Sequence, residues 1–335
     1  MKANSSKNIK AAITAVGGFV PKDFISNQDL EKVLDTTDEW ITTRTGIKKR
    51  RILKGEGKGT SYLAIKAAEN LLKKNKIDPE SIDLVIVSTI TPDYRGPATA
   101  ATVASAIYAK NAYAFDLSAA CSGFLYGMST ASSFIESGRY NKILLIGADK
   151  MSSIVDYSRR ETSVLFGDGA GAVLVEPSEN KFGWEDEYLR SDGIGAEWLM
   201  VKAGGSMYPL TQEALDSGWH YITQDGKIVF KAAVSEMANA TKEIVNRNNL
   251  NPKDIKFLLP HQANKRIIDA AAEKINLDKN KVLMNIREYG NTTAATIPLL
   301  MFDYESKLSK GDKLILTAFG AGLTWGAAYL TWAYD

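Results

Sequence analysis

Thiol and imidazole side chains are scarce in this sequence. Cys121 is the only cysteine among 335 residues, so an intramolecular disulfide is impossible and a thiolate-rich metal site cannot form. Only two histidines occur, His220 and His261, which argues against a histidine-rich metal site as well. We therefore expect no metal, and we expect any thiol chemistry to depend on Cys121 alone.

Long apolar runs and an excess of charge of one sign are also missing. No apolar run is long enough, free of charges and helix breakers, to span a membrane, and the N-terminal residues lack the apolar core of a signal peptide. We therefore expect a cytoplasmic protein. The 41 basic and 39 acidic residues nearly cancel, to a net charge of +2. This balance argues against a nucleic-acid partner recognised by bulk charge.

Strand and helix signals alternate along the chain. Continuous β-branched runs predict strands buried on both faces, and apolar residues at helical spacing predict helices. The predicted strands cover residues 9–19, 82–90, 112–117, 142–149, 170–177, 255–260, 313–319 and 324–334. The predicted helices cover residues 60–75, 101–110, 122–138, 227–250, 264–277 and 292–311.

This alternation predicts an α/β protein built in layers. The order of elements is similar before and after about residue 180, so we expect two similar halves, residues 1–180 and 181–335. Residues 181–225 interrupt the alternation and are rich in glycine and tryptophan. We expect a connection or flap there.

Cys121 stands where a predicted strand gives way to a predicted helix. The small residues Ser118, Ala119, Ala120 and Gly123 permit a tight turn around it. Unpaired N–H groups at a helix start favour a thiolate and lower the pKa of the thiol, and serine nucleophiles occupy comparable strand–turn–helix positions. The alternative is that Cys121 is only a small buried apolar side chain.

His261 and Asn291 occupy two further turns of the same kind. A helix N-terminus disfavours imidazolium, so His261 is expected to stay neutral and to donate an N–H. Gly290 supplies backbone freedom before Asn291, which opens a predicted helix. Either side chain could instead only cap a helix. Such turns gather at one edge of an α/β sheet, which predicts a Cys/His/Asn site. A papain-like hydrolase is the alternative, but its cysteine lies near the mature N-terminus.

Six motifs carry a resemblance to a known family. They are DTTDEWITTRTGIKKRR, DLSAACSGF, FGDGAGAVL, PHQANKR, YGNTTAATIPL and FGAGLTWG. With these motifs in this order, the chain resembles the β-ketoacyl-acyl-carrier-protein synthase III family nearly from end to end, outside residues 181–225. The resemblance implies a thiolase-like fold of five layers, αβαβα, made from two similar halves.

The resemblance also implies an activity. Family members are acyltransferases that condense an acyl-coenzyme A primer with malonyl-acyl-carrier protein, with loss of CO₂, and so initiate fatty-acid synthesis. Coenzyme A thioester is a substrate, and no cofactor is expected. The family works as a homodimer. A related thiolase-fold acyltransferase that makes a polyketide starter or another secondary metabolite is the alternative, because such relatives share the Cys/His/Asn set.

Individual roles follow from the matching positions. The catalytic positions are Cys121, His261 and Asn291, and the backbone N–H groups of Cys121 and Ala321 form the oxyanion hole. Decarboxylation needs neutral donors on an enolate oxygen, a role that suits His261 and Asn291. The coenzyme A positions are Trp40, Arg44, Arg160 and Asn264. The carrier-protein positions are Gln262, Ala263, Asn264, Lys265 and Arg266. The acyl-pocket positions are Gly96 and Phe319.

The sequence departs from the family pattern at a few positions. Gly96 stands where the family often has a bulky residue, which predicts that branched or longer primers load well. Ala321 and Leu323 replace an expected glycine and phenylalanine, although Ala321 still offers its N–H. The glycine-rich residues 167–171 are structural in this family, and such a string alone is weak evidence for a nucleotide. The basic run 48–51 reads as solvated surface rather than a phosphate site.

Overall fold

Two β-sheets organise the chain, for which the computed structural model describes residues 9–178 and 181–335. The first sheet consists, in spatial order, of β1 (Lys10–Phe19), β7 (Gly169–Ser178), β6 (Ile143–Asp149), β4 (Leu84–Ser88) and β5 (Tyr113–Leu117). The second consists of β8 (Trp184–Ser191), β13 (Thr324–Thr331), β12 (Lys313–Gly320) and β11 (Ile255–Pro260). Residues 1–8 and the predicted boundary at residue 180 lie outside the described residues.

The two sheets share one strand arrangement. In chain order, the earliest strand of each sheet, β1 or β8, pairs antiparallel with a late strand, β7 or β13. That late strand also pairs antiparallel with β6 or β12, and β6 or β12 in turn pairs parallel with β4 or β11. The first sheet has one further parallel strand, β5. This common arrangement is what the similar order of elements in the sequence led us to expect.

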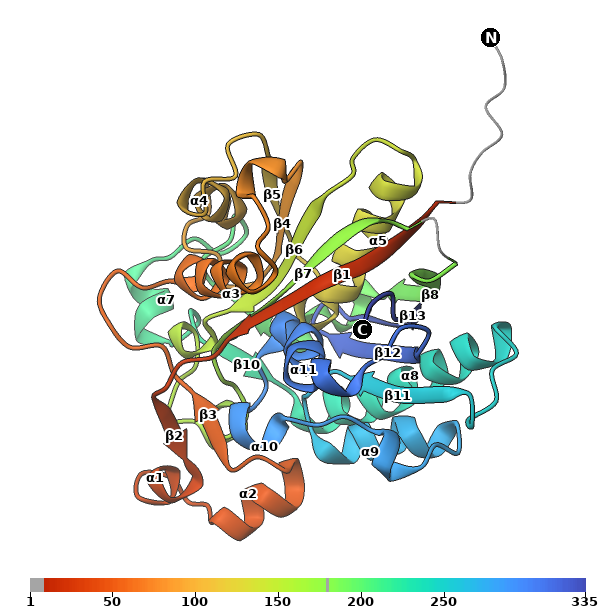
Figure 1. Ribbon diagram of the computed structural model, residues 1–335. Helices are drawn as coiled ribbons and strands as arrows, with labels where there is room; N and C mark the ends of the chain where they lie inside the picture. The colour runs from red at the N-terminus through yellow and green to blue at the C-terminus, as the bar shows by residue number, and fades with distance from the viewer. Residues whose placement is uncertain (1–8, 179–180) are drawn as a thin grey trace.

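Helices cover both faces of each sheet and complete five layers, αβαβα (Figure 1). The outer layer on the first sheet is α3 (Thr60–Asn75) and α4 (Thr99–Ala106). The middle layer, between the sheets, is α5 (Gly123–Glu136) and α11 (Thr296–Tyr304). The outer layer on the second sheet is α8 (Gly226–Arg247) and α9 (Lys265–Lys274). The fold is therefore thiolase-like, as predicted.

Three apolar interfaces hold these layers together. Leu63 and Val85 lie in the interface between α3 and the first sheet, Phe124 in the interface between the sheets, and Ile244 and Ile315 in the interface under α8. Strands β4 and β6 are buried at every residue, which explains their unbroken apolar sequences. Because the middle helices are covered on both sides, the turns that lead into them are buried as well.

Short elements lie outside the layers. The N-terminal insertion contains β2 (Phe24–Ser26), α1 (Asn27–Glu31), α2 (Asp38–Thr45) and β3 (Lys49–Arg51). Residues 181–225 are not only a connection, because β8 is a strand of the second sheet. The remainder of that segment forms a small excursion with β9 (Leu199–Val201), α7 (Gln212–Asp216) and β10 (Ile222–Gln224). Two further helices, α6 (Arg160–Ser163) and α10 (Ile286–Tyr289), each form a single turn.

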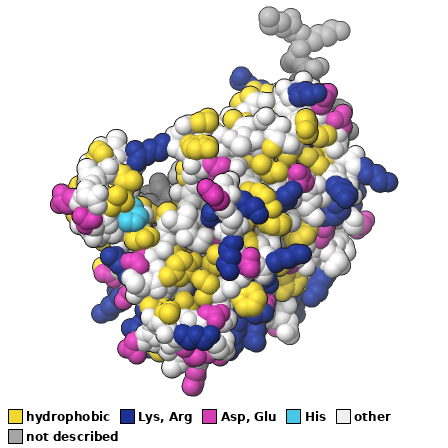
Figure 2. Space-filling model, turned by 90° about the vertical axis from the view of Figure 1, so that its left-hand side faces the viewer, with side chains coloured by type: hydrophobic (Ala, Val, Ile, Leu, Met, Phe, Trp, Pro, Cys, Tyr) yellow, Lys and Arg dark blue, Asp and Glu magenta, His cyan; other side chains and the backbone are white. Residues whose placement is uncertain are grey.

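The surface in Figure 2 mixes charges of both signs. Basic and acidic side chains lie interspersed on this face, with apolar patches between them, so it has no continuous basic surface. Among the residues that the structure describes, no helix is long and apolar enough to cross a membrane, and no cluster of three or more His, Cys, Asp or Glu side chains is arranged to hold a metal ion.

Candidate active site

Cys121 lies in a buried turn between β5 and α5. The turn, Ala120–Ser122, is a short 3₁₀ helix, and Ala120 has a φ of +47°, an uncommon conformation for a residue with a side chain. Two hydrogen bonds with Thr324, at the start of β13, hold the turn: the Ser122 hydroxyl donates to the Thr324 carbonyl at 3.0 Å, and the Thr324 hydroxyl donates to the Ala119 carbonyl at 2.9 Å. The thiol is free and only 7% exposed.

The electrostatics of the thiol differ from the prediction. Burial raises the pKa of Cys121, and the charge of the nearby Asp149 raises it further, while a hydrogen bond with the residue's own backbone acts in the opposite direction. The prediction that the turn lowers this pKa is therefore wrong, because desolvation outweighs the donors at the helix start. Cys121 rests as a thiol, and its proton needs an acceptor when the sulfur attacks.

His261 follows β11 and is almost completely buried. Its ring Nδ1 lies 2.8 Å from the Thr296 hydroxyl oxygen, and its backbone N–H donates to the Thr317 carbonyl at 2.7 Å. Burial lowers the pKa of His261 from 6.5 to about 3, so the ring is neutral. The neutral state agrees with the prediction, although burial, rather than a helix N-terminus, is its cause.

Asn291 is fixed so that its amide nitrogen is available to donate. The Asn291 side-chain oxygen accepts the Thr293 backbone N–H at 2.9 Å, which leaves the NH₂ group free of that contact. The Asn291 backbone pairs with Leu165 and Gly167. Gly290 before it has a φ of +72°, and a Cβ there would lie 2.8 Å from the Leu165 carbonyl, so only glycine fits this turn.

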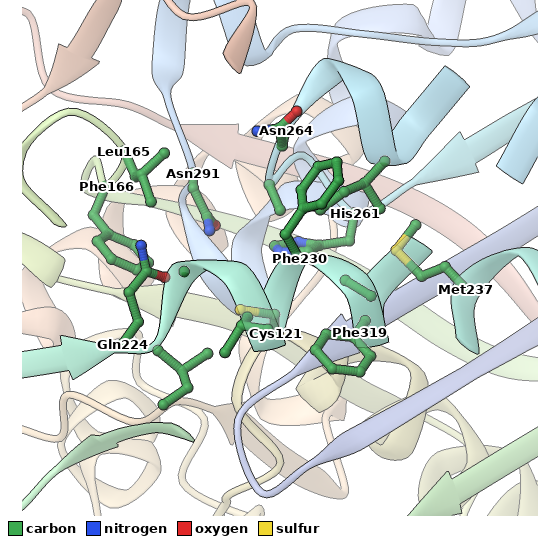
Figure 3. A pocket seen from close by; sticks show the side chains of 16 residues that line it. Cys121, Leu165, Phe166, Gln224, Phe230, Met237, His261, Asn264, Asn291 and Phe319 are labelled. Atoms are coloured by element: carbon green, nitrogen blue, oxygen red, sulfur yellow. The ribbon is translucent and has the colours of Figure 1, made fainter. Parts of the chain in front are cut away.

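The three predicted catalytic side chains border one cavity (Figure 3). The cavity has a volume of about 110 Å³, and Cys121 faces the space that His261 and Asn291 also border. Phe319 lies on its wall, as expected. Its other apolar walls are Leu165, Phe166, Leu199, Val229, Phe230, Ala233, Met237 and Ile267. The α8 members of this group are Val229, Phe230, Ala233 and Met237. They were not predicted from the sequence, because apolar residues at helical spacing indicate only that one face of a helix is buried.

Asp149 joins the turns that carry the site. It ends β6 and is fully buried. One of its oxygens accepts hydrogen bonds from Thr89, Ile90 and Thr91, and the other accepts the Thr293 hydroxyl and the Ala294 backbone N–H. Burial raises the pKa of this carboxyl, while these hydrogen bonds favour its charged form. The signal in the sequence was an acidic residue at the end of a buried strand.

A second cluster brings three of the predicted coenzyme A residues together on the surface. The Arg44 guanidinium lies 5.3 Å from the centre of the Trp40 ring, and the Arg160 guanidinium lies 5.0 Å from it. Arg160 also donates to the Asp35 carbonyl at 2.8 Å. These distances are typical of cation–π contacts. The two guanidinium groups and the Trp40 ring thus lie together at the surface, and none of them borders the cavity.

The predicted carrier-protein segment is divided by the structure. Ala263 and Asn264 border the cavity, and Asn264 also caps α9 by accepting the Arg266 N–H. Lys265 and Arg266 are exposed; Lys265 pairs with Asp269 at 2.6 Å, and the Arg266 guanidinium lies 4.6 Å from the Phe230 ring centre.

Gln262 does not fit the role predicted for it. Its side chain is 0% exposed and donates to the Pro260 carbonyl at 2.7 Å. Its oxygen accepts the backbone N–H groups of Asn285 and Ile286, each at 3.1 Å. A buried amide with these partners cannot contact a carrier protein directly, and it instead fixes the start of α10.

Two predicted positions lie outside the cavity of the single chain. Gly96 is exposed in the loop before α4, and a Cβ there would meet nothing within 4 Å, so the chain's own fold does not bring it to the acyl pocket. Ala321 borders a neighbouring hollow of about 370 Å³ that lies beside residues 118–120. Its N–H remains a prediction for the oxyanion hole.

The two sequence segments that look like phosphate sites are structural. Gly167 is packed so tightly that a Cβ would lie 2.1 Å from the Tyr289 carbonyl, and Asp168 accepts the Leu53 N–H at 2.7 Å. In the basic run, Arg50 is buried and donates to the Val164 carbonyl, and Lys49 pairs with Glu288. The run is therefore not simply solvated surface.

A buried thiol, a neutral imidazole and an amide donor thus border one cavity of a thiolase-like fold, an arrangement that suits an acyltransferase. Comparison with known proteins identifies the family. Residues 115–193 match the family model described as 3-oxoacyl-[acyl-carrier-protein] synthase III, and residues 245–332 match the model of its C-terminal part.

Relatives match over nearly the whole chain. A β-ketoacyl-[acyl-carrier-protein] synthase III from Porphyromonas gingivalis is 53% identical over 98% of both chains, and one from Chlorobium chlorochromatii is 55% identical over 97% of this chain and 100% of the relative. The crystal structure of the Aquifex aeolicus 3-oxoacyl-[acyl-carrier-protein] synthase III covers 97% of this chain and 100% of its own, with 44% identity and a TM-score of 0.88. The chain belongs to the β-ketoacyl-acyl-carrier-protein synthase III family.

Proposed function

We propose that this protein condenses an acyl-coenzyme A primer with malonyl-acyl-carrier protein, with loss of CO₂, and so initiates fatty-acid synthesis. The observation that carries the proposal is the single cavity that holds one thiol and two neutral hydrogen-bond donors. The high identity to synthase III relatives favours this reaction over a related acyltransferase that makes a polyketide starter or another secondary metabolite.

The first half-reaction transfers the acyl group to Cys121. The sulfur attacks the thioester carbonyl, coenzyme A leaves as its thiol, and the acyl group stays on the enzyme. The oxyanion of the tetrahedral intermediate needs two donors, for which we propose the backbone N–H groups of Cys121 and Ala321. Coenzyme A is consumed as a thioester substrate, so this scheme requires no cofactor.

The second half-reaction forms the new carbon–carbon bond. Departure of CO₂ leaves its electron pair on the malonyl group as an enolate, so no base is needed. Neutral donors stabilise the enolate oxygen, and we propose that the Asn291 amide and an N–H of His261 supply them, since the amide nitrogen is available and the ring is neutral. The enolate carbon then attacks the acyl carbonyl and releases Cys121. The product is a 3-oxoacyl carrier protein.

Two charged surfaces suit the two substrates. We assign coenzyme A to the cluster of Trp40, Arg44 and Arg160, where an aromatic ring and two cations can hold a base and phosphates. Asn264 borders the cavity between the surface and Cys121 and suits the amide groups of pantetheine. Lys265 and Arg266 are exposed beside the cavity and suit an acidic carrier protein through charge.

Homodimer formation is supported by one edge of the first sheet. Strand β5 has a paired neighbour on only one side among the described residues, and Tyr113 on this strand is 42% exposed. A second copy that pairs along this edge would cover it. Sedimentation should give twice the chain mass of 36.6 kDa, and Tyr113→Lys should shift the protein toward the monomer. A monomeric wild-type protein would contradict this assembly.

Intact-mass analysis tests the mechanism most directly. The protein is incubated with a panel of acyl-coenzyme A esters, from acetyl to branched and longer chains. We expect a covalent acyl adduct that is absent in Cys121→Ala, and because Cys121 is the only thiol, the adduct needs no mapping. Absence of an adduct with every ester would exclude the proposal. If acetyl alone is loaded, only the broad primer range predicted from Gly96 is wrong.

A further inference from the structure

Thr296 contacts Nδ1 of His261 and does not border the cavity. It is the first residue of α11, it is 1% exposed, and its hydroxyl oxygen lies 2.8 Å from His261 Nδ1. The same hydroxyl donates to the Thr293 carbonyl at 2.9 Å. A hydroxyl has one proton and a carbonyl can only accept, so both contacts are made together only when Nδ1–H donates to Thr296. The neutral ring then carries no proton on Nε2.

A second arrangement is available at little cost. The Thr293 carbonyl also accepts the backbone N–H of Thr296, so this oxygen keeps a partner when the hydroxyl turns away. The hydroxyl can then donate to Nδ1, once Nδ1 has released its proton to water and Nε2 has taken one up from water. The side chain of Thr293 is held by its hydrogen bond to the buried Asp149. The Thr293 carbonyl therefore stays in place when the Thr296 hydroxyl rotates.

The two half-reactions require opposite states of Nε2. In acyl transfer, the bond from sulfur to the acyl carbon forms as the Cys121 proton passes to a bare Nε2, and the same proton then passes to the departing sulfur of coenzyme A. In condensation, the enolate oxygen needs Nε2–H as a donor that keeps its proton. When Cys121 leaves the new product with the electron pair, it takes one proton from water. His261 is neutral again at the end of each half-reaction.

We propose that Thr296 is a positioning residue that lets His261 serve both half-reactions, by accepting from Nδ1 in the resting enzyme and donating to it during condensation. The inference rests on the proposed roles of Cys121 and His261, and it extends them to a side chain that does not border the cavity. A valine at this position keeps the shape of the side chain but removes the hydroxyl. The buried Nδ1–H would then have no acceptor, so we expect the neutral ring to carry its proton on Nε2 instead.

The rates of the two half-reactions in Thr296→Val form the kinetic test. Single-turnover acylation, followed by mass, should fall by at least about tenfold, while decarboxylation of malonyl-carrier protein should stay within about threefold of wild type. Thr296→Ser should restore acylation. Thr241→Val is the matched control, because Thr241 is equally buried and its hydroxyl donates to the Met237 carbonyl at 2.7 Å. Equal loss of both steps, or none, in Thr296→Val would overturn the proposal.

Nitrogen NMR of histidine-labelled protein reports the tautomer directly. The chain has only two histidines, and His220→Gln assigns their signals. We expect the proton of His261 on Nδ1 in wild type and Thr296→Ser, and on Nε2 in Thr296→Val; unchanged signals in Thr296→Val would overturn the inference. His261→Ala separates the two ideas. If it leaves both steps intact, the proposed function of His261 fails, whereas if it impairs them and Thr296→Val changes nothing, only the role of Thr296 fails.

Discussion

A Cβ atom on Gly320 would lie 2.6 Å from the backbone nitrogen of Cys121. Gly320 is the last residue of β12 and is buried, and the same Cβ would lie 3.1 Å from the Cys121 Cβ. A Cβ atom essentially never lies so close to a nonbonded heavy atom, so the turn of Cys121 and the end of β12 can approach only because this position has no side chain. The proposed oxyanion hole depends on that approach.

Gly320→Ala should therefore impair acyl transfer. The added methyl group forces the Cys121 backbone away from its position, and loss of an oxyanion donor typically costs about 10²–10³ in rate. We expect a fall of at least about 10² in the rate of single-turnover acylation. Gly193→Ala is the control, because a Cβ there meets nothing within 4 Å. Wild-type acylation by a folded Gly320→Ala protein would contradict this packing argument.

Alanine substitutions of the two donors should separate the half-reactions. In Asn291→Ala, condensation should fall further than acylation, because only the enolate uses this amide. In His261→Ala, both steps should slow, because the ring also accepts the Cys121 proton. Each lost donor should slow decarboxylation by about 10²–10³. Parallel assays of adduct formation and of CO₂ release measure the difference. Equal losses in the two assays for Asn291→Ala would refute this division of roles.

Loss of the surface cluster should weaken binding of coenzyme A without slowing the chemistry. Arg160→Ala removes one of the cations over Trp40, and one exposed cation–π contact corresponds to a rise of about twofold to fivefold in KM for acyl-coenzyme A. The kcat should not change, since these side chains lie outside the cavity. Arg190→Ala is the matched control, because Arg190 lies 4.2 Å from the Tyr188 ring on β8. A fall in kcat with constant KM would disprove the assignment.

Buried His261 should make folding stability fall in mild acid. Its pKa is lowered to about 3 in the folded state, so between pH 6.5 and 3 the unfolded chain binds a proton that the folded chain does not. The free energy of unfolding should therefore decrease as pH falls, by about 2 kcal/mol at pH 5 from this residue alone.

His261→Gln provides the comparison for this pH effect. Between pH 7 and 5, the non-titrating variant should lose about 2 kcal/mol less stability than wild type, as measured by denaturant unfolding. The buried carboxyls Asp149 and Asp168 are present in both proteins, so their effects cancel in the difference. Parallel pH profiles for the two proteins would show that His261 becomes protonated in the folded state.

Helices and strands with one clear pattern of apolar residues were predictable from the sequence. The helix predicted over residues 60–75 is α3 with the same bounds, because one apolar stripe and a polar face leave no other arrangement. The strands around β4 and β6 were equally clear, since both faces are buried. The turns of Cys121, His261 and Asn291 were predicted to meet because each follows a strand or opens a helix near the same sheet edges.

Elements that depend on distant contacts were not predictable. A helix was predicted over residues 292–311, but α11 covers only Thr296–Tyr304. The preceding turn is bonded to Asp149, and Thr293 in it has a φ of +51°, which no local propensity favours. Strand β8 was missed for a similar reason, because its pairing partner, β13, lies more than a hundred residues away in the chain. The raised pKa of Cys121 likewise depends on burial by other elements.

The buried Gln262 amide gives the site a property that its residue types do not reveal. It is next to His261, and its oxygen binds the first turn of α10, whose end leads through Gly290 to Asn291. The two proposed enolate donors are therefore connected to each other through the Gln262 amide and α10. Helix α8 supplies several other residues of the cavity wall and takes no part in that connection. Substitutions on α8 can therefore change the shape of the cavity, and with it the range of acyl groups, without changing the distance between the two proposed donors.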